Sequence, residues 1–222
     1  ATLSAQYYEE DDNNYAFSYF GQSEGSSISV PFGGPILGGN TVGMVGGGFY
    51  DINSDQEPIN DRDGQLINLT IDYAFNDRWS LKSITSSQSM DRFLRDDLDS
   101  TDANLFGQNN YTEESDSFGQ ELILNYSADR LDVLGGVMYF EEDLYGEVRV
   151  PLTNLCFLLA PAACGTPVGD FLNGGNYLQD GDVDIEAWGA YVEANYSISD
   201  KWSVIAGLRY NYEERDGTGS FV

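Results

Sequence analysis

The C-terminal part of the chain alternates between apolar and polar positions in a way that predicts a long β-strand. In "KWSVIAGLRYNYEERDG" (201–217), every second residue from Trp202 to Tyr212 is apolar or aromatic. The residues between them are mostly polar or small and include Arg209. Successive side chains of a strand point to opposite faces. One face of this strand is therefore apolar and has aromatic rings at both ends.

The same local pattern occurs three times and predicts three hairpins. The segments are "IDYAFNDRWSL" (71–81), "LNYSADRLDV" (124–133) and "ANYSISDKWSV" (194–204). Each has a Tyr, then Asp with Arg or Lys, then Trp or Leu, between alternating runs. Asp and Asn favour tight turns because their side chains bond the local backbone. Each segment is therefore expected to be strand, short turn, strand.

The third hairpin allows a specific register to be predicted. If Ser197 lies opposite Lys201, then Tyr196 faces Trp202 and Trp188 faces Tyr210. Tyr191 then lies opposite Gly207, where an aromatic ring can cover the gap left by a glycine.

The pattern predicts seven strands in all, and three long connections separate them. The expected strands are 1–20, 64–75, 79–95, 117–127, 131–145, 185–197 and 201–214, and the expected outer loops are 21–63, 97–116 and 146–184. The turns at one end of the sheet are short, whereas the connections at the other end are long, Gly-rich and acidic. Soluble sandwiches usually have short loops at both ends and shorter strands.

The length of the apolar stripe indicates a membrane environment. The ten residues from Trp202 to Tyr212 span about 33 Å at about 3.3 Å per residue. A tilt of about 40° reduces this to about 25 Å, the height of the apolar band of an outer-membrane β-barrel. The predicted fold is thus all-β, an antiparallel transmembrane barrel segment with short periplasmic turns and long extracellular loops. A soluble β-sandwich with the apolar face in its core remains the alternative.

One predicted strand fits this pattern poorly. In "WSLKSITSSQSMDRF" (79–93), Trp79 and Leu81 are apolar, but Ser83, Thr85, Ser87 and Ser89 follow at the same parity. A β-bulge after Lys82 would instead bring Ile84 and Met90 to the apolar face.

An odd number of strands cannot close a bacterial single-chain barrel. An open sheet edge in lipid leaves backbone groups unsatisfied at several kcal/mol each. Residues 1–222 are therefore expected to be part of one larger barrel domain whose other strands lie outside this sequence. The first residues already have strand character, so the natural start is expected to lie upstream.

The composition of the chain excludes several classes of function. The chain has 10 basic and 37 acidic residues, a net charge of −27, which excludes nucleic acid as a partner. It has no His, so His-based catalysis and His-ligated metals are excluded. The two cysteines, Cys156 and Cys164, predict a disulfide and an oxidising compartment, and two free thiols are the alternative.

Several stretches together resemble the β-barrel of TonB-dependent outer-membrane receptors. They are "DSFGQELILNY" (116–126), "DRLDVLGGVMYFEED" (129–143), "EAWGAYVEANYSISDKWSVIAGLRYNYEERDG" (186–217) and, less closely, "ITSSQSMDRF" (84–93). The family's hairpin ends on a "G-L-R-Y-x-x-E" strand, which Gly207, Leu208, Arg209, Tyr210 and Glu213 match. Its "S-x-E-x-R-L" strand is matched by Gln120, Glu121 and Leu122, but Leu124 or Asn125 stands where the family more often has Arg.

The resemblance implies a barrel of about 22 strands plugged by another domain. It implies a bacterial outer-membrane receptor, not an enzyme, that imports a scarce ligand: a siderophore, a cobalamin-like complex, an oligosaccharide or a peptide. The implied partners are outer-membrane lipid, lipopolysaccharide and a TonB-type inner-membrane complex that acts through the plug. A passive porin-like channel or a structural, adhesive surface barrel is the alternative function.

Parity places a set of polar residues toward the lumen. These candidates for ligand or plug contact are Asn68, Asp72, Glu121, Asn125, Tyr191, Glu193, Arg209 and Asn211. In the loop 21–63, Phe32, Met44, Phe49 and Tyr50 are candidates for ligand contact or for packing on one another.

The acidic loops contain candidate ligands for one kind of metal ion, Ca²⁺. Asp51, Asp55, Asp61 and Asp63 offer carboxylates suited to Ca²⁺. Their stretch "DINSDQEPINDRDG" lacks the residue order of a Ca²⁺-binding loop, so a solvated loop surface is the favoured interpretation. No other cofactor is expected.

Overall fold

The computed structural model describes residues 1–13, 56–97, 108–151, 161–173 and 175–221. Seven strands account for most of them: β1 (Thr2–Asp12), β2 (Ile59–Ala74), β3 (Trp79–Asp97), β4 (Gln108–Ala128), β5 (Leu131–Pro151), β6 (Asn176–Ser199) and β7 (Trp202–Phe221). A 3₁₀ turn, η1 (Pro161–Ala163), and a short helix, α2 (Pro167–Asn173), lie between β5 and β6.

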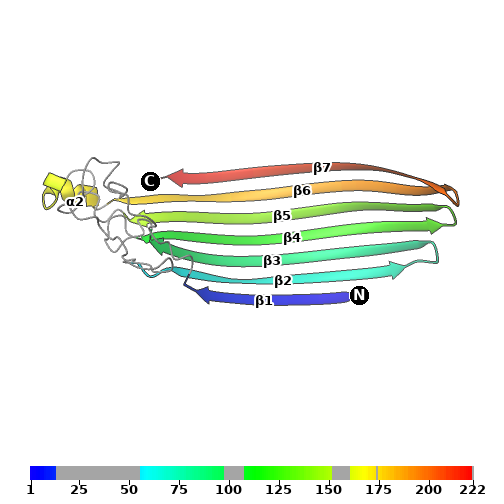
Figure 1. The fold of residues 1–222 in the computed structure, drawn as a ribbon, viewed down its shortest axis with the longest axis horizontal. Coiled ribbons are helices and arrows are strands. Elements are labelled where there is room, and N and C mark those ends of the chain that lie inside the picture. Colours follow the sequence, from blue (N-terminus) through cyan, green and yellow to red (C-terminus); the bar gives the residue numbers. More distant parts are fainter. Residues whose placement is uncertain (14–55, 98–107, 152–160, 174, 222) are drawn as a thin grey trace.

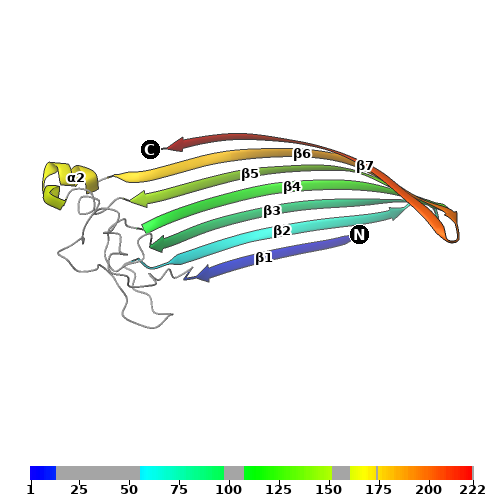
Figure 2. The same cartoon turned by 45° about the horizontal axis from the view of Figure 1, so that its top comes forward.

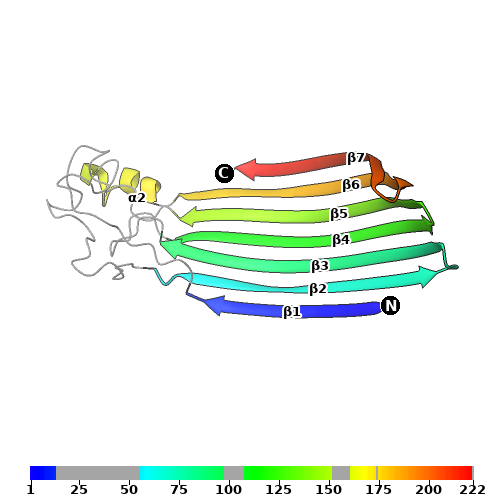
Figure 3. The ribbon, with the colours of Figure 1, turned by 45° about the vertical axis from the view of Figure 1, so that its right-hand side comes forward.

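The seven strands form one antiparallel sheet in which each strand pairs with its neighbours in sequence. The turns 75–78, 129–130 and 200–201 lie together at one end of the sheet, and the chain leaves the other end through its longer connections (Figures 1 and 3). The predicted seven-stranded antiparallel sheet and its asymmetry of connections are confirmed. Along these residues the sheet is open, with β1 and β7 at its edges.

Short polar side chains form the predicted turns. Asn76 Oδ1 accepts hydrogen bonds from the backbone N–H of Arg78 at 2.9 Å and of Trp79 at 3.1 Å. This side-chain bond to the backbone two and three residues on is the usual way in which Asn stabilises a turn. At 200–201, the Ser199 hydroxyl accepts a bond from the N–H of Lys201 at 3.4 Å.

The predicted register of the third hairpin is wrong by two residues. Tyr196 pairs with Val204 and Trp188 with Tyr212, because the turn lies at 200–201 and Ser197 pairs with Ser203, whereas the prediction placed Ser197 opposite Lys201. A shift of two residues preserves parity, so both strands keep their predicted faces.

The strands extend further than predicted at the end opposite the turns. At that end, the residues outside the predicted strands that belong to β2, β3, β4, β5, β6 and β7 are, in that order, 59–63, 96–97, 108–116, 146–151, 176–184 and 215–221. The apolar outer face ends there because its positions become mostly acidic or otherwise polar, while backbone pairing continues. The first strand is described only to Asp12, so the rest of the predicted strand 1–20 lies outside the described residues.

The sheet is a single layer and has almost no core. Among the described residues, the only buried apolar side chains are Leu94 and Val150. Large apolar side chains are instead exposed, including Trp202 at 73% and Leu208 at 75%. A sheet with such a face is stable only when an apolar medium or another layer covers it.

The pairing gives the sheet two distinct faces. We call the face that carries Trp202 and Leu208 the outer face and the face that carries Arg209 the inner face. In register with the strand β7, the outer face includes Tyr196, Val192 and Trp188 of β6 and Val137 and Tyr139 of β5. The curvature of the sheet is visible in Figure 2.

Aromatic rings border the apolar band of the outer face at both ends. At the turn end, Trp79 packs on Tyr126 with ring centroids 4.7 Å apart, and Trp202 lies near the last turn. At the other end, Tyr139 packs edge-on against Trp188 at 5.5 Å, and Tyr212 is paired with Trp188. Aromatic rings at both limits of an apolar band are the pattern of the two membrane interfaces.

The band shifts along the strands as one crosses the sheet. On β1 the end of the band farthest from the turns is Tyr7. Compared with the cross-strand row of outer-face residues that contains Tyr7, the band ends one row nearer the turns on β4, at Phe118, and two rows nearer on β7, at Tyr212. A band that stays level in a membrane must drift in this way across strands that are tilted and staggered, as in a barrel wall.

The suspected bulge in β3 is absent. The pairing of β3 with β2 and β4 is continuous, so Ser83, Thr85 and Ser87 lie on the outer face among apolar neighbours. Gln120 of β4 reduces the cost, because it accepts a bond from the Thr85 hydroxyl at 2.7 Å and donates one to Ser83 Oγ at 3.0 Å.

Beyond the band, the outer face becomes strongly acidic. One cross-strand row runs through four aspartates paired in register from β4 to β7: Asp116, Asp143, Asp184 and Asp216. The next row outward holds four acids paired from β1 to β4: Glu9, Asp63, Asp91 and Glu114. Like charges directly opposite one another destabilise a sheet. The outer face is therefore a surface of concentrated negative charge at the end of the sheet opposite the turns.

In the connection between β5 and β6, Cys164 follows η1 and is disulfide-bonded. Its predicted partner, Cys156, lies outside the described residues. Across the residues that the structure describes, there is no helix long and apolar enough to cross a membrane.

Candidate functional site

All eight polar residues predicted to face the lumen lie on the inner face. The registers place Asn68, Asp72, Glu121, Asn125, Tyr191, Glu193, Arg209 and Asn211 on the same side of the sheet. Their shared parity is what the alternation determined, and the structure adds which of them meet.

Four of these residues form one connected group. The Tyr191 hydroxyl donates a hydrogen bond to Glu121 Oε1 at 2.7 Å, although β5 lies between their strands. The Arg209 guanidinium lies over the Tyr191 ring, 5.6 Å from its centroid, and Arg209 Nε donates to Asn211 Oδ1 at 2.9 Å. The inner face of β4, β6 and β7 is thus joined by side chains as well as by backbone.

A glycine makes this group possible. Gly136 pairs with Tyr191, and a Cβ at Gly136 would lie 2.4 Å from the Tyr191 ring. The ring therefore lies over Gly136, and its hydroxyl reaches Glu121 of β4. The predicted covering of a glycine by Tyr191 does occur, but the glycine is Gly136 of β5, whereas Gly207 pairs with Glu193.

The other four candidates are spread over the wall. Asn125 and Glu193 both pair with Leu134, which separates them. Asp72 forms an ion pair with Lys82 at 3.5 Å, and Asn68 pairs with Ser86. The structure does not join them to the connected residues Glu121, Tyr191, Arg209 and Asn211, which we call the Tyr191 group.

A row of charged residues nearer the end of the sheet opposite the turns was missed by the sequence reasoning. Arg62 contacts Glu10 at 2.5 Å, and Arg92 lies 3.8 Å from Glu113. Arg62 also lies over the ring of Tyr8, 5.6 Å from its centroid. The four charged residues are paired in register across β1 to β4, and only the register could have revealed this.

The same row continues into three glycines: Glu113 pairs with Gly146, Gly146 with Gly181, and Gly181 with Gly219. A Cβ at Gly146 would meet nothing within 4 Å, and at Gly181 and Gly219 it would meet only backbone atoms. Glycine in a strand often marks a place where another backbone or a ligand approaches closely.

Three other inner-face glycines each lie under a neighbouring side chain, in contrast to these three. Besides Gly136 under Tyr191, Gly64 lies under Tyr8, and Gly189 lies under the Met138 side chain. In those rows a large side chain fills the space that the missing Cβ leaves. We call the row of Gly146, Gly181 and Gly219 the glycine floor.

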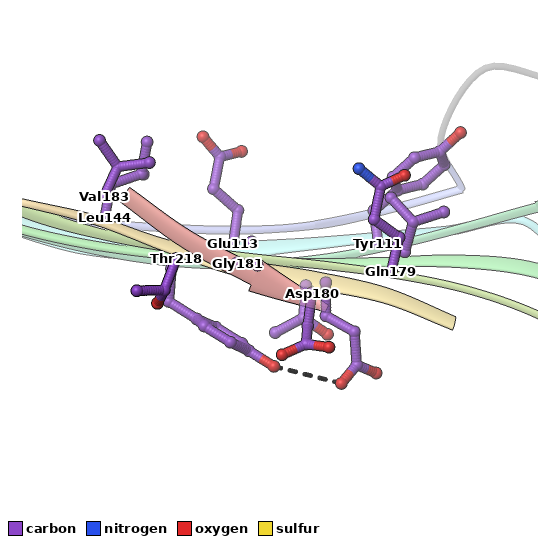
Figure 4. Close-up of a pocket in the computed structure, with 14 residues that line it drawn as sticks. Tyr111, Glu113, Leu144, Gln179, Asp180, Gly181, Val183 and Thr218 are labelled. Atoms are coloured by element: carbon purple, nitrogen blue, oxygen red, sulfur yellow. Dashed lines mark hydrogen bonds between the residues drawn. The ribbon is translucent and has the colours of Figure 1, made fainter. Parts of the chain in front are cut away.

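The glycine floor forms the bottom of a recess of about 520 Å³. Leu144 and Val183 border it on the side nearer the turns, and Tyr111, Val148 and Gln179 border it on the side farther from them. In Figure 4, Glu113, Leu144, Val183, Gln179 and Tyr111 project from the same face of the sheet. This volume lies within the range of about 300–1,000 Å³ typical of small-ligand sites.

The opposite face at this level belongs to the acidic surface. There the Tyr145 hydroxyl donates to Glu147 Oε2 at 3.2 Å, the bond drawn in Figure 4. Burial raises the pKa of Tyr145, and the bond to Glu147 and the charges of Asp180 and Asp182 raise it further. The phenol therefore stays protonated above its ordinary range.

The structure gives little support to the predicted Ca²⁺ ligands and does not describe the predicted ligand contacts in the loop 21–63. Of the suggested Ca²⁺ ligands, Asp61 and Asp63 lie on the outer face of β2, while Asp51 and Asp55 lie outside the described residues. In the described ranges, no group of three or more His, Cys, Asp or Glu side chains is placed to hold a metal ion. Phe32, Met44, Phe49 and Tyr50 also lie outside the described residues.

The geometry thus combines an apolar band of membrane height, an inner face of hydrogen-bonding groups, and a recess near the end of the sheet opposite the turns. No curated protein matches the chain. The family model described as "TonB dependent receptor-like, beta-barrel" matches residues 2–221. That match covers almost every residue of the sequence and includes all seven strands. The chain therefore belongs to the TonB-dependent receptor β-barrel family.

Proposed function

We propose that this chain is part of the wall of an outer-membrane receptor that imports a scarce ligand with energy from a TonB-type inner-membrane complex. Membership of the family supports the receptor and transport role in general. The observation that carries the proposal is that the two faces of the single sheet differ. The outer face is apolar and bordered by aromatic rings, and the inner face carries polar side chains that hydrogen-bond to one another.

The two faces have different proposed partners. Lipid covers the apolar band, and the acidic rows lie at the level of lipopolysaccharide, where divalent cations offset negative charge on both sides. The plug domain of the receptor covers much of the inner face, where the Tyr191 group and the Arg62 and Arg92 ion pairs offer hydrogen bonds. A complete barrel satisfies the open backbone edges of β1 and β7 by further strands.

The electrostatics bear on the ligand class. With 37 acidic against 10 basic residues, the chain repels anions at long range. A neutral or cationic ligand approaches such a mouth more readily than a strongly anionic one.

The test is uptake by cells that express the full-length receptor containing this segment. We expect accumulation of a radiolabelled ligand in cells with a functional TonB complex, and loss of accumulation when the TonB-type protein is deleted. Equal uptake in both strains would contradict energy coupling and would favour the passive, porin-like alternative. Receptor level in isolated outer membranes is the control for both strains.

A further inference from the structure

We propose that the glycine floor binds a neutral, hydroxyl-bearing ring, that is, a sugar residue of an oligosaccharide. This inference rests on the proposed function and specifies its ligand class. Some glycines of the inner face lie under a neighbouring side chain, and others do not. Gly64, Gly136 and Gly189 are each filled by a neighbouring side chain, whereas no side chain lies within 4 Å of a Cβ built at Gly146.

The shape of the recess suits a flat ring. Three glycines in register expose peptide backbone across β5, β6 and β7, and an added atom at Gly146 would meet open space. A ligand can therefore approach the sheet more closely here than where Cβ atoms project. Leu144 and Val183 project on one side of the floor and Tyr111 on the other (Figure 4). Val148 pairs with Tyr111, so a ring on the floor has apolar contacts at both edges.

The polar groups of the recess suit hydroxyls. Glu113 offers carboxylate oxygens that accept hydrogen bonds, and Gln179 offers both a donor and an acceptor. The phenol of Tyr111, a residue that is 39% exposed, does both as well. Sugar hydroxyls also donate and accept, so each polar group has a suitable partner.

The charges disfavour an anionic ligand. The residues that line the recess include neither Lys nor Arg, and the acid among them whose side chain lies on the inner face is Glu113. The side chains of Glu147 and Asp180 belong to the outer face. Arg92 lies at the far side of Glu113, 3.8 Å from its carboxylate, and offsets part of that one charge. A ferric chelate with net negative charge would bury its charge beside the Glu113 carboxylate, with no Lys or Arg among the lining residues as a partner, which is costly.

The test is binding to the full-length receptor purified in detergent, measured by isothermal titration calorimetry. The probes are a set of linear neutral oligosaccharides, glucans and xylans, with an anionic ferric catecholate as the comparison. The variant Gly146→Leu fills the floor. Gly135→Leu is the matched control, because it adds the same side chain to the outer face of the same strand, where the nearest atom would be 3.7 Å away.

We expect at least one oligosaccharide to bind, with an affinity that falls by about tenfold or more in Gly146→Leu, equivalent to about 1.4 kcal/mol. Gly135→Leu should bind as the unchanged receptor does. If Gly146→Leu fails to fold, Glu113→Gln and Tyr111→Ala test the same site without adding bulk, and each should weaken binding. Unchanged affinity in all three variants, or binding of the ferric catecholate alone, would overturn the inference.

The uptake assay separates this inference from the proposed function. TonB-dependent uptake of the catecholate that is insensitive to Gly146→Leu would leave the receptor function standing and refute the sugar site. Binding of an oligosaccharide that is sensitive to Gly146→Leu, with uptake independent of TonB, would do the reverse.

Discussion

The hydroxyl of Tyr191 lies 2.7 Å from Glu121 Oε1, and the ring crosses the intervening strand β5 above Gly136. This bond joins residues 70 positions apart in sequence. It links three strands on the inner face and orients the ring beneath Arg209. The arrangement depends on a residue with no side chain at position 136.

Two substitutions should therefore reveal the coupling between Tyr191 and Gly136. Tyr191→Phe removes the bond to Glu121 and should destabilise the folded receptor by about 0.5–1.5 kcal/mol. Gly136→Ala displaces the ring and should cost a similar amount. Because both act on one contact, the double variant should cost less than the sum of the two. Urea titration of the receptor refolded into lipid vesicles measures each value, and simple additivity would refute the coupling.

The acidic row should oppose folding. Asp143 pairs with Asp116 on one side and with Asp184 on the other. Asp143→Asn should stabilise the receptor by about 0.2–1 kcal/mol at low salt, because like charges directly opposite destabilise a sheet. The gain should shrink as salt screens the charges. Asp129→Asn in the turn 129–130 is the control and should change little. A destabilised Asp143→Asn would indicate that a cation occupies the row.

The two faces should respond differently to an added charge. Leu208→Arg places a cation in the middle of the apolar band and should destabilise insertion by about 2–4 kcal/mol. Ser203→Arg, on the inner face of the same strand, should cost much less because water or polar groups can solvate it. Equilibrium folding into phospholipid vesicles provides both values. Equal costs would mean that the outer face is not in contact with lipid.

The disulfide is testable by chemistry. Cys164 is disulfide-bonded, and Cys156 is its predicted partner. Digestion without reductant should release one linked pair of peptides containing both cysteines, which reduction separates. Alkylation of Cys156 in the untreated, unfolded protein would contradict the pairing.

Hydrophobic periodicity was enough to predict the strands of the apolar band and the face of each candidate residue. It failed at the ends of the strands, where 108–116 and 176–184 continue the sheet without an apolar face to mark them. It also failed in β3, where serines lie on the outer face because Gln120 bonds Ser83 and Thr85. That compensation comes from a neighbouring strand and leaves no local signal.

What the sequence by itself determined is parity: the side-chain period of a strand is two, so alternation assigns Tyr191, Arg209 and Glu121 to one face whatever the register. Only the tertiary structure decided which of them meet. The position of the last turn, at 200–201, puts the β6–β7 pairing two residues away from the predicted register, which preserved the faces but placed Tyr191 opposite Arg209. The alignment of Gly146, Gly181 and Gly219 has the same origin, because residues far apart in sequence become neighbours only through pairing across the sheet.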